Sequence, residues 1–402
     1  MKKKFFALMM AMTMVLSLAA CGGETAETTN DDTTSEDTAS GTAFKIGTIG
    51  PLTGDAAIYG QAVANGAAIA VEEINAAGGD IQFELKSEDD VNDGETSVNA
   101  YNTLMDWGMQ LLVGPTTTGP SVSVAAKCYE DRTFMLTPSA SSTDVIADKD
   151  NVYQVCFTDP AQGAASAQYI AEHGLATKVA VIYNNGDVYS TGIYQTFEAK
   201  AAELGLEIVK VTTFTDETTD FSVQVTETKN AGAELVFLPI YYTPASMILT
   251  QAASMDYSPI FFGVDGMDGI LTMEGFDTSL AEGVLLLTPF SADAKDEKTV
   301  NFVNKYVELY GDTPNQFAIR TVDVFHDDQG GALRGENRIH ILSAGGVTAD
   351  TTPEETCEIM IEQMQKLTIE GLTGTMTWSA TGEVSKTPTA VKIENGVYVG
   401  ME

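Results

Sequence analysis

The residues that could do chemistry in this chain lie at the ends of predicted strands. In the first half, loops 114–119 and 138–142 are rich in Gly, Ser and Thr, and each follows a short apolar run. In the second half, predicted strands end at Asn184-Asn185, at Tyr241-Tyr242 and at Asp265. The carboxyl ends of parallel strands meet at one edge of a sheet, which is where open α/β sheets bind small ligands. We therefore expect these groups to face a ligand.

Covalent catalysis has little support. Neither GxSxG nor HExxH occurs, and His173 is the only histidine outside one unusual segment, residues 319–347. An enzyme, for example a hydrolase, therefore ranks far below a binding protein.

Cys128, Cys156 and Cys357 show no CxxC or Cys/His ligand spacing, so a zinc site is not expected. One disulfide stays open, although apolar surroundings favour buried, unpaired thiols.

The elements that must position these residues begin with a strand, a Gly-rich turn and a helix. Residues 44–49 are short and β-prone, and residues 50–79 run from the turn into an amphipathic helix. Gly78 and Gly79 are expected to end this helix with a left-handed cap. The turn lacks the Gly-Lys-Ser/Thr of a phosphate-binding loop. The apolar face of the helix comprises Val63, Ala67, Ala70, Val71 and Ile74.

Strands and helices then alternate along the chain. Further strands are expected at 81–85, 110–113, 133–137, 178–183, 207–211, 235–238 and 259–263. Helices are expected at 95–107, from the loop at 114–119 to residue 131, and at 162–174, 191–204, 221–231, 246–255 and 299–310. A β-rich tail covers 374–399. We predict an α/β protein with two doubly wound parallel-sheet lobes, joined by a multi-strand hinge with a ligand cleft between them. The N-terminal lobe is assigned 44–158 and 289–373, and the C-terminal lobe 159–288 and 374–402.

The first residues have the parts of a secretory signal. Lys2, Lys3 and Lys4 precede an apolar run at 5–18, and Leu18-Ala19-Ala20-Cys21 resembles a bacterial lipobox. This predicts a signal peptide at 1–20 and a lipid on Cys21, which would anchor the protein on the outer face of the cell membrane. An ordinary signal peptide with an accidental cysteine is the alternative. Residues 21–43 have no large apolar group beyond the lipidated cysteine and read as a disordered acidic tether.

The composition excludes some partners. The chain has 402 residues and a net charge of −36, which repels nucleic acid and anionic lipid surfaces. Solubility at a cell surface is a sufficient reason for this acidity. The hydrophobic content of 44% is enough for the cores of two domains.

An ordered set of motifs carries a family resemblance. The run GTIGPLTGDAAIYGQAVANGAAIAVEEINAAGG is followed in order by VGPTTTG, LTPSASS, YNNGDVYSTG, PIYYTPA and GVDG. This set resembles the leucine/isoleucine/valine-binding proteins of ABC importers, which have the type I periplasmic-binding-protein fold. The resemblance implies a monomer that captures an amino acid, delivers it to membrane permease subunits, and uses no cofactor and no metal.

The resemblance also implies roles for residues of the first lobe. Thr118 matches a family Ser or Thr whose hydroxyl and N–H receive the ligand carboxylate. Ala140 and Ser141 match a dipeptide that offers a carbonyl to the ammonium, and N–H and hydroxyl groups to the carboxylate. Tyr59 matches an aromatic residue at the side-chain end of the pocket. Taken alone, a loop threonine is usually only a turn residue.

In the second lobe, Asp265 falls where the family places an acid facing the ammonium. Tyr189 matches a tyrosine that closes over the ligand, and Tyr241 or Tyr242 matches another. A zwitterion taken out of water needs donors at one end and an anion at the other, so this set is chemically sensible. The simpler interpretations are edge-strand aromatics for the tyrosine pair and a turn former for Asp265. An amide, urea or another small organic acid as ligand, or a sensor domain, stays open.

Residues 319–347 do not fit the family pattern. They contain Arg320, Arg334 and Arg338, whereas Arg132 is the only arginine elsewhere. His326 and His340 lie in the same stretch, and glycines interrupt any helical period. Our hypothesis is a compensated frameshift in the gene sequence, with a divergent insertion as the alternative; resequencing would separate them. As written, the segment lacks a family pocket tyrosine and puts one lobe helix in doubt.

Overall fold

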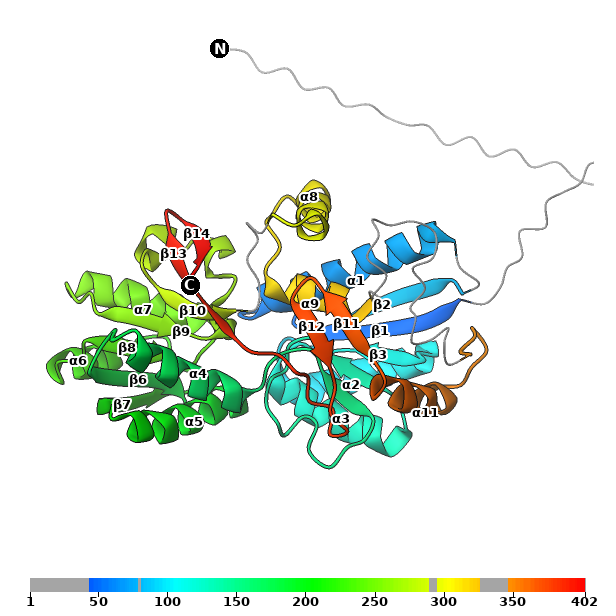
Figure 1. Ribbon diagram of the computed structural model, residues 1–402, viewed down its shortest axis with the longest axis horizontal. Helices are drawn as coiled ribbons and strands as arrows, with labels where there is room; N and C mark the ends of the chain where they lie inside the picture. Colours follow the sequence, from blue (N-terminus) through cyan, green and yellow to red (C-terminus); the bar gives the residue numbers. More distant parts are fainter. Residues whose placement is uncertain (1–42, 79–80, 289–294, 326–345, 402) are drawn as a thin grey trace, which may run out of the picture. The chain divides into compact units, whose positions relative to one another are not determined.

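The computed structural model describes residues 43–78, 81–288, 295–325 and 346–401. The predicted signal peptide at 1–20, the predicted lipidation site Cys21 and almost all of the predicted tether lie outside these residues. The described part contains two lobes, each built around a mainly parallel sheet (Figure 1). Two α/β lobes were predicted, and this fold class is confirmed.

The first lobe contains a five-stranded parallel sheet with the strand order β2-β1-β3-β4-β5. Strand β2 is added on one side of β1, and β3 and the later strands are added on the other side. The point between β1 and β3 is therefore a topological switch point, where open α/β sheets form ligand crevices. The strands are β1 (Phe44–Gly50), β2 (Phe83–Asp89), β3 (Leu111–Val113), β4 (Met135–Thr137) and β5 (Val152–Gln154), and the helices between them are α1 (Ala57–Ala77), α2 (Gly94–Trp107) and α3 (Thr118–Asp131).

The second lobe contains a seven-stranded sheet with the order β14-β13-β10-β9-β8-β6-β7. Five strands are parallel, whereas β13 runs antiparallel to β10 and β14 antiparallel to β13. Its strands are β6 (Lys178–Asn184), β7 (Glu207–Phe214), β8 (Leu235–Leu238), β9 (Ile260–Gly263), β10 (Leu285–Thr288), β13 (Thr389–Glu394) and β14 (Val397–Gly400), and its helices are α4 (Asp159–Glu172), α5 (Val188–Leu204), α6 (Ser222–Asn230) and α7 (Tyr242–Ser254).

Local sequence explains where the helices begin and end. Gly78 ends α1 at φ 73°, the left-handed cap that was predicted. The Asp93 and Asp187 side chains cap α2 and α5 by accepting hydrogen bonds from first-turn N–H groups. Helix α7 begins four residues before its predicted start, because Pro244 fits the first turn of a helix.

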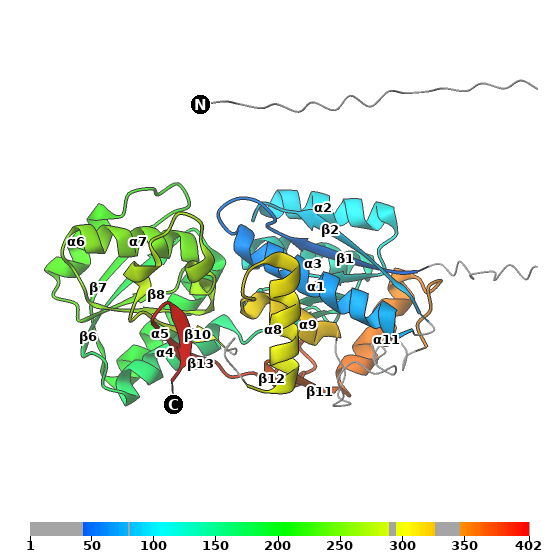
Figure 2. The same ribbon diagram turned by 90° about the horizontal axis from the view of Figure 1, so that it is seen from above.

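Helix α9 (Gln316–Phe325) lies beside α1 in both ribbon views (Figures 1 and 2). A Cβ added at Gly66 of α1 would lie 2.3 Å from the Ala318 carbonyl oxygen, so the two backbones are in close contact. Asp323 of α9 accepts hydrogen bonds from the Leu372 N–H at 2.6 Å and the Thr373 N–H at 3.0 Å. The doubt about this lobe helix is therefore corrected for residues 319–325, which are buried almost throughout. Residues 326–345 are outside the described part.

Later elements complete both lobes: 3₁₀ turns η1 (Asp265–Met267), η2 (Ile270–Thr272) and η3 (Thr278–Ala281), helices α8 (Glu297–Tyr310) and α11 (Pro353–Met364), and strands β11 (Thr368–Gly371) and β12 (Gly374–Thr377).

The sequence assigned residues from 374 onward to the second lobe. In the structure Met376, Trp378 and Val384 pack in the core of the first lobe, and the Trp378 indole donates to the Gln154 carbonyl at 2.7 Å. Contact with the second sheet begins only with β13.

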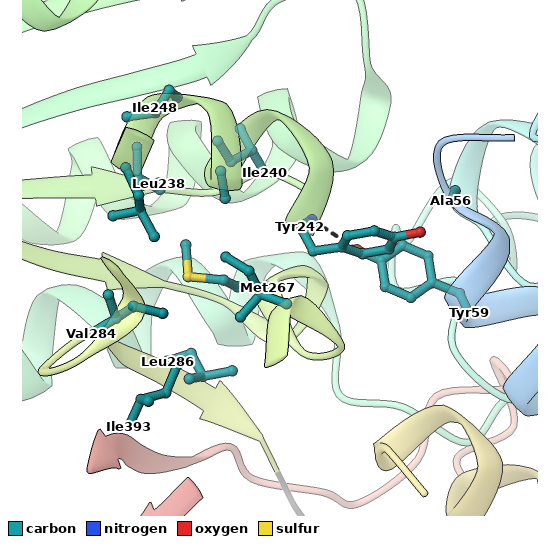
Figure 3. Close-up of a cluster of buried hydrophobic side chains, with 14 of the residues drawn as sticks. Ala56, Tyr59, Leu238, Ile240, Tyr242, Ile248, Met267, Val284, Leu286 and Ile393 are labelled. Carbon is teal, nitrogen blue, oxygen red and sulfur yellow. Dashed lines mark hydrogen bonds between the residues drawn. The ribbon is translucent and has the colours of Figure 1, made fainter. Parts of the chain in front are cut away.

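One apolar cluster reaches across both lobes. It runs from Leu238 and Leu286 of the second sheet, past Met267, to Tyr242 and to Tyr59 of α1 (Figure 3). Cys128, Cys156 and Cys357 are buried and unpaired, as the sequence favoured. Across the described part of the chain, no helix is long and apolar enough to cross a membrane.

Candidate ligand-binding site

A small pocket lies between the strand ends of the two lobes. Five of the eight predicted ligand residues line it. The lining consists of Tyr59, Thr116, Thr117, Thr118, Ser139, Tyr189, Tyr241, Asp265, Gly266 and Phe317.

The first lobe presents hydrogen-bonding groups that have no partner. The side-chain oxygens of Thr117, Thr118 and Ser141 are buried and make no hydrogen bond within the described residues. Thr117 and Thr118 begin α3, and Thr117 gives this helix no side-chain cap. The free N–H groups and the dipole of a helix N-terminus favour an anion. Unpaired buried hydroxyls are unfavourable, so this end of the pocket is prepared for an oxyanion such as a carboxylate.

The second lobe presents Asp265, whose carboxylate is already paired. Tyr189 donates from its hydroxyl to Asp265 Oδ1 at 2.8 Å, and Arg320 Nη1 of α9 lies 3.1 Å from Asp265 Oδ2. The Gly266 N–H donates in turn to the Tyr189 hydroxyl at 2.9 Å. The Arg320 guanidinium also stacks on Phe157, with 4.9 Å between its carbon and the ring centre. The negative charge that was predicted to face a ligand ammonium thus has a resident counter-ion.

Tyr59 and Tyr242 connect the lobes. The Tyr59 hydroxyl donates to the Gly266 carbonyl and accepts from the Tyr242 N–H at 3.2 Å, the dashed line in Figure 3. The Tyr242 hydroxyl accepts from the Ile58 N–H at 3.3 Å. Tyr241 stacks on Tyr189 at 4.9 Å between ring centres. The pocket therefore has an aromatic wall contributed by both lobes.

Asp159, the first residue of α4, was missed by the sequence reasoning. It is 1% exposed, and neither carboxylate oxygen has a hydrogen-bond partner among the described residues. Its N–H donates to the Ser141 carbonyl at 2.9 Å, which fixes it beside a predicted ligand residue. Burial raises the pKa of the Asp159 carboxyl well above its usual range, the nearby Ser141 hydroxyl acts in the opposite direction, and Asp265 adds to the rise.

The other three predicted residues are not among those that line the pocket. Ala140 and Ser141 are buried, but the Ala140 carbonyl accepts from the Gln154 side chain at 2.7 Å. Tyr242 serves the lobe contact rather than the lining. Burial also raises the pKa of the phenols of Tyr59, Tyr189 and Tyr241 well above the usual value, so these hydroxyls stay protonated at neutral pH.

Some lining residues gave a sequence signal and others gave none. Thr116, Thr117 and Ser139 belong to the hydroxyl-rich loops already singled out. Phe317 comes from the return helix α9, and no motif marked it. Within residues 43–78, 81–288, 295–325 and 346–401, no group of three or more His, Cys, Asp or Glu side chains could hold a metal ion. The fold and this pocket define a two-lobed α/β ligand-binding protein.

Comparisons with known proteins agree with this class. A family model described as a periplasmic binding protein matches residues 43–325, and the chain belongs to this family. A Leu/Ile/Val-binding protein homolog of Brucella melitensis is 30% identical over 367 residues, covering 89% of this chain and 93% of that relative. The family binds solutes and does not consist of enzymes.

Solved structures show the same fold. The branched-chain amino acid transporter substrate-binding protein LivJ of Streptococcus pneumoniae, in complex with isoleucine, is 25% identical with a TM-score of 0.77, over 89% of this chain and 97% of that one. A solute-binding protein of an ABC transporter from R. palustris, in complex with benzoate, is 18% identical with a TM-score of 0.76, over 89% and 95%. Related folds thus bind both an amino acid and an acid without an amino group.

Proposed function

We propose that the protein is an exported, lipid-anchored solute-binding protein that captures an amino acid, preferably an aliphatic one, and delivers it to an ABC importer. It works as a monomer on the outer face of the cell membrane. The observation that carries the proposal is the set of buried, unpartnered groups around the pocket: Thr117, Thr118 and Ser141 on one lobe and Asp159 near them. Such groups need a polar ligand, and the relatives' names supply its class.

The proposed binding mode starts from the roles implied by the family. The helix N-terminus at Thr118 and the Ser141 hydroxyl receive the carboxylate, and the aromatic wall contacts the side chain. In the family pattern Asp265 is the acid that faces the ammonium. The proposed ligand-binding residues are Tyr59, Thr118, Ala140, Ser141, Tyr189, Tyr241, Tyr242 and Asp265.

Thermal stabilisation by a panel of ligands tests this function. A ligand that binds only the folded state raises the melting temperature, by an amount that grows with its concentration relative to Kd. We expect free aliphatic amino acids to raise it and their amides to raise it less. No shift with any free amino acid, for a protein with a cooperative melt, would contradict the proposal.

The anchor is tested separately. Cys21→Ser removes the sulfur that would carry the lipid. We expect the protein to move from the membrane fraction to the surrounding medium when expressed in its host. Retention in the membrane would favour an uncleaved signal segment instead.

A carboxylic acid without an amino group is the second candidate. The ion pair between Arg320 and Asp265 favours it, because this pair neutralises the acid predicted to hold the ammonium. Benzoate and short aliphatic acids in the same panel would then give the largest shifts. An α-amino acid and its deaminated analogue therefore separate the two candidates directly.

A further inference from the structure

Two buried carboxylates have different surroundings: Asp265 lines the pocket, whereas Asp159 lies next to Ser141 and is not among the lining residues. Asp265 is satisfied: Tyr189 donates to one oxygen at 2.8 Å and Arg320 pairs with the other at 3.1 Å. Its backbone is also held, because its N–H donates to Gln162 Oε1 at 3.2 Å and its carbonyl accepts from Gln316 Nε2 at 3.2 Å. An incoming ammonium would have to compete with a guanidinium that is fully buried.

Asp159 has no such partner. Its side chain is buried, and both of its oxygens lack a hydrogen bond within the described residues. Buried carboxyl groups are normally paired, because an unpaired one loses its hydration without compensation. Asp159 is therefore the free acceptor of the site, whereas Asp265 is not.

The position of Asp159 suits a ligand atom next to the carboxylate. Its N–H is bonded to the Ser141 carbonyl at 2.9 Å, and the Ser141 hydroxyl is itself unpartnered. From the other side, a Cβ added at Gly192 of α5 would lie 3.3 Å from Asp159 Oδ2, so α5 closes that approach. In an α-amino acid the ammonium is one carbon away from the carboxylate, which matches a donor group and an acid on adjacent residues.

We propose that Asp159 receives the ammonium of the bound amino acid, and that Asp265 with Arg320 forms a structural pair behind it. This inference rests on the proposed function and names the residue that gives the site its preference for an amino group. Arg320 accounts for the difference between the two acids, because it neutralises Asp265 and leaves Asp159 unpaired. A single unpaired carboxyl can match a single ammonium.

The proposal has a consequence for protons. Burial raises the pKa of Asp159, and the acids Asp265, Asp187 and Asp144 raise it further, whereas the Ser141 hydroxyl lowers it. Burial therefore favours the protonated carboxyl in the free protein. Binding an ammonium favours the carboxylate, so the carboxyl gives its proton to the buffer as the ion pair forms.

Calorimetry of the purified protein with leucine and with isocaproate, which is leucine without its amino group, tests the inference. Titrations in two buffers of different ionisation heat measure proton release. For the wild type we expect leucine to bind at least about tenfold more tightly than isocaproate, a difference set by one charge-assisted contact, and to release a proton that isocaproate does not.

Asp159→Asn should weaken leucine binding by about tenfold or more, abolish proton release and leave isocaproate binding nearly unchanged. Asp90→Asn is the matched control: Asp90 is also a buried acid with an unpartnered oxygen, but it follows β2, where its other oxygen accepts from the Asn92 N–H at 2.9 Å. This control should retain the preference for leucine and the proton release.

A folded Asp159→Asn protein that still prefers leucine to the same degree would overturn the inference and leave the proposed function intact. If that variant does not fold, the wild type decides alone: equal affinity for leucine and isocaproate overturns the inference, and proton release with leucine only supports it. A wild type that binds no free amino acid would overturn the proposed function and this inference together.

Discussion

At the scale of single residues, the pocket is defined by polar groups without partners. The Thr118 and Ser141 hydroxyls and the Asp159 carboxyl are buried in the protein at a free-energy cost, and a ligand can offset it. Removing such a group should therefore affect folding and binding in opposite ways. That contrast distinguishes a ligand site from ordinary core packing.

Thr118→Val tests this contrast, because it replaces a hydroxyl with a methyl group of nearly the same size. We expect the melting temperature of the free protein to stay the same or rise, since an unsatisfied buried hydroxyl is lost. Amino-acid affinity should fall by about 1 kcal/mol or more, which is about fivefold or more. Melting curves and calorimetry measure the two effects.

Thr228→Val is the matched control for that experiment. Thr228 is equally buried, but its hydroxyl donates to the Val225 carbonyl at 3.0 Å in α6. This variant should lose stability and keep its affinity. Thr118→Val with reduced stability and unchanged affinity would show that Thr118 belongs to the core alone.

The pair of Arg320 and Asp265 gives a second prediction at this scale. Arg320→Met leaves a buried carboxylate without its cation and should lower the free energy of unfolding by about 3–5 kcal/mol. The double variant Asp265→Asn with Arg320→Met removes both charges and should recover most of the loss. Urea unfolding measures both, and a fully stable single variant would contradict the pairing.

Sequence reasoning found the loops of the site and Asp265, but it found neither Asp159 nor the pairing of Asp265 with Arg320. The loops at 114–119 and 138–142 could be predicted because hydroxyl residues after a parallel strand fall at the ligand edge. Whether Asp265 or Asp159 is free depends on Arg320, which is 55 residues from one and 161 from the other in the chain. Only the packing of α9 against the lobes reveals that contact.

At the scale of elements, the close contact of α1 and α9 holds the first lobe together. Helix α9 carries Arg320, Asp323 and Phe317, so its position determines one side of the pocket. The contact depends on Gly66, which leaves no room for a side chain beneath Ala318. The fit of these two helices therefore supports both the fold and the site.

Gly66→Ala should push the helices apart and lower the free energy of unfolding by about 1–3 kcal/mol. Gly119→Ala is the control: its added Cβ would have no neighbour within 4 Å, and in α3 it should be neutral or stabilise by about 0.5–1 kcal/mol. Denaturant unfolding compares the two. Equal stability of both variants would mean that the backbones can separate freely.

Most elements followed from periodicity, and the exceptions have physical reasons. Strands β8 and β9 of the second sheet are apolar runs between turn residues, which the pattern identifies. Strands β5 (VYQ) and β11 (TIEG) are short and contain polar residues, so neither forms an apolar run such as that of β3 (LLV). Residues 319–325 were doubted for their composition, yet they form a buried helix and fall within the family match. The frameshift hypothesis for the remaining residues stays a prediction.

At the scale of the whole molecule, charge is the dominant feature. The net charge is −36, and the excess acidic side chains repel one another in the folded state, which disfavours the compact protein. Added salt screens this repulsion, because the screening length falls from about 30 Å at 10 mM to about 3 Å at 1 M.

We therefore expect the melting temperature to rise by a few degrees between low and high sodium chloride. Potassium chloride should give the same rise, which separates screening from ion-specific effects on burial. A melting temperature that falls with salt would mean that local ion pairs outweigh the overall repulsion.

The late chain segments in both lobes have a consequence for synthesis and export. The second sheet needs β13 and β14, which end at Gly400, and the first lobe needs Trp378 and Val384 for its core. Neither lobe can finish folding until these late segments have been made. A chain threaded through a translocation channel would therefore stay incompletely folded until these segments emerge, which is the state that such a channel requires.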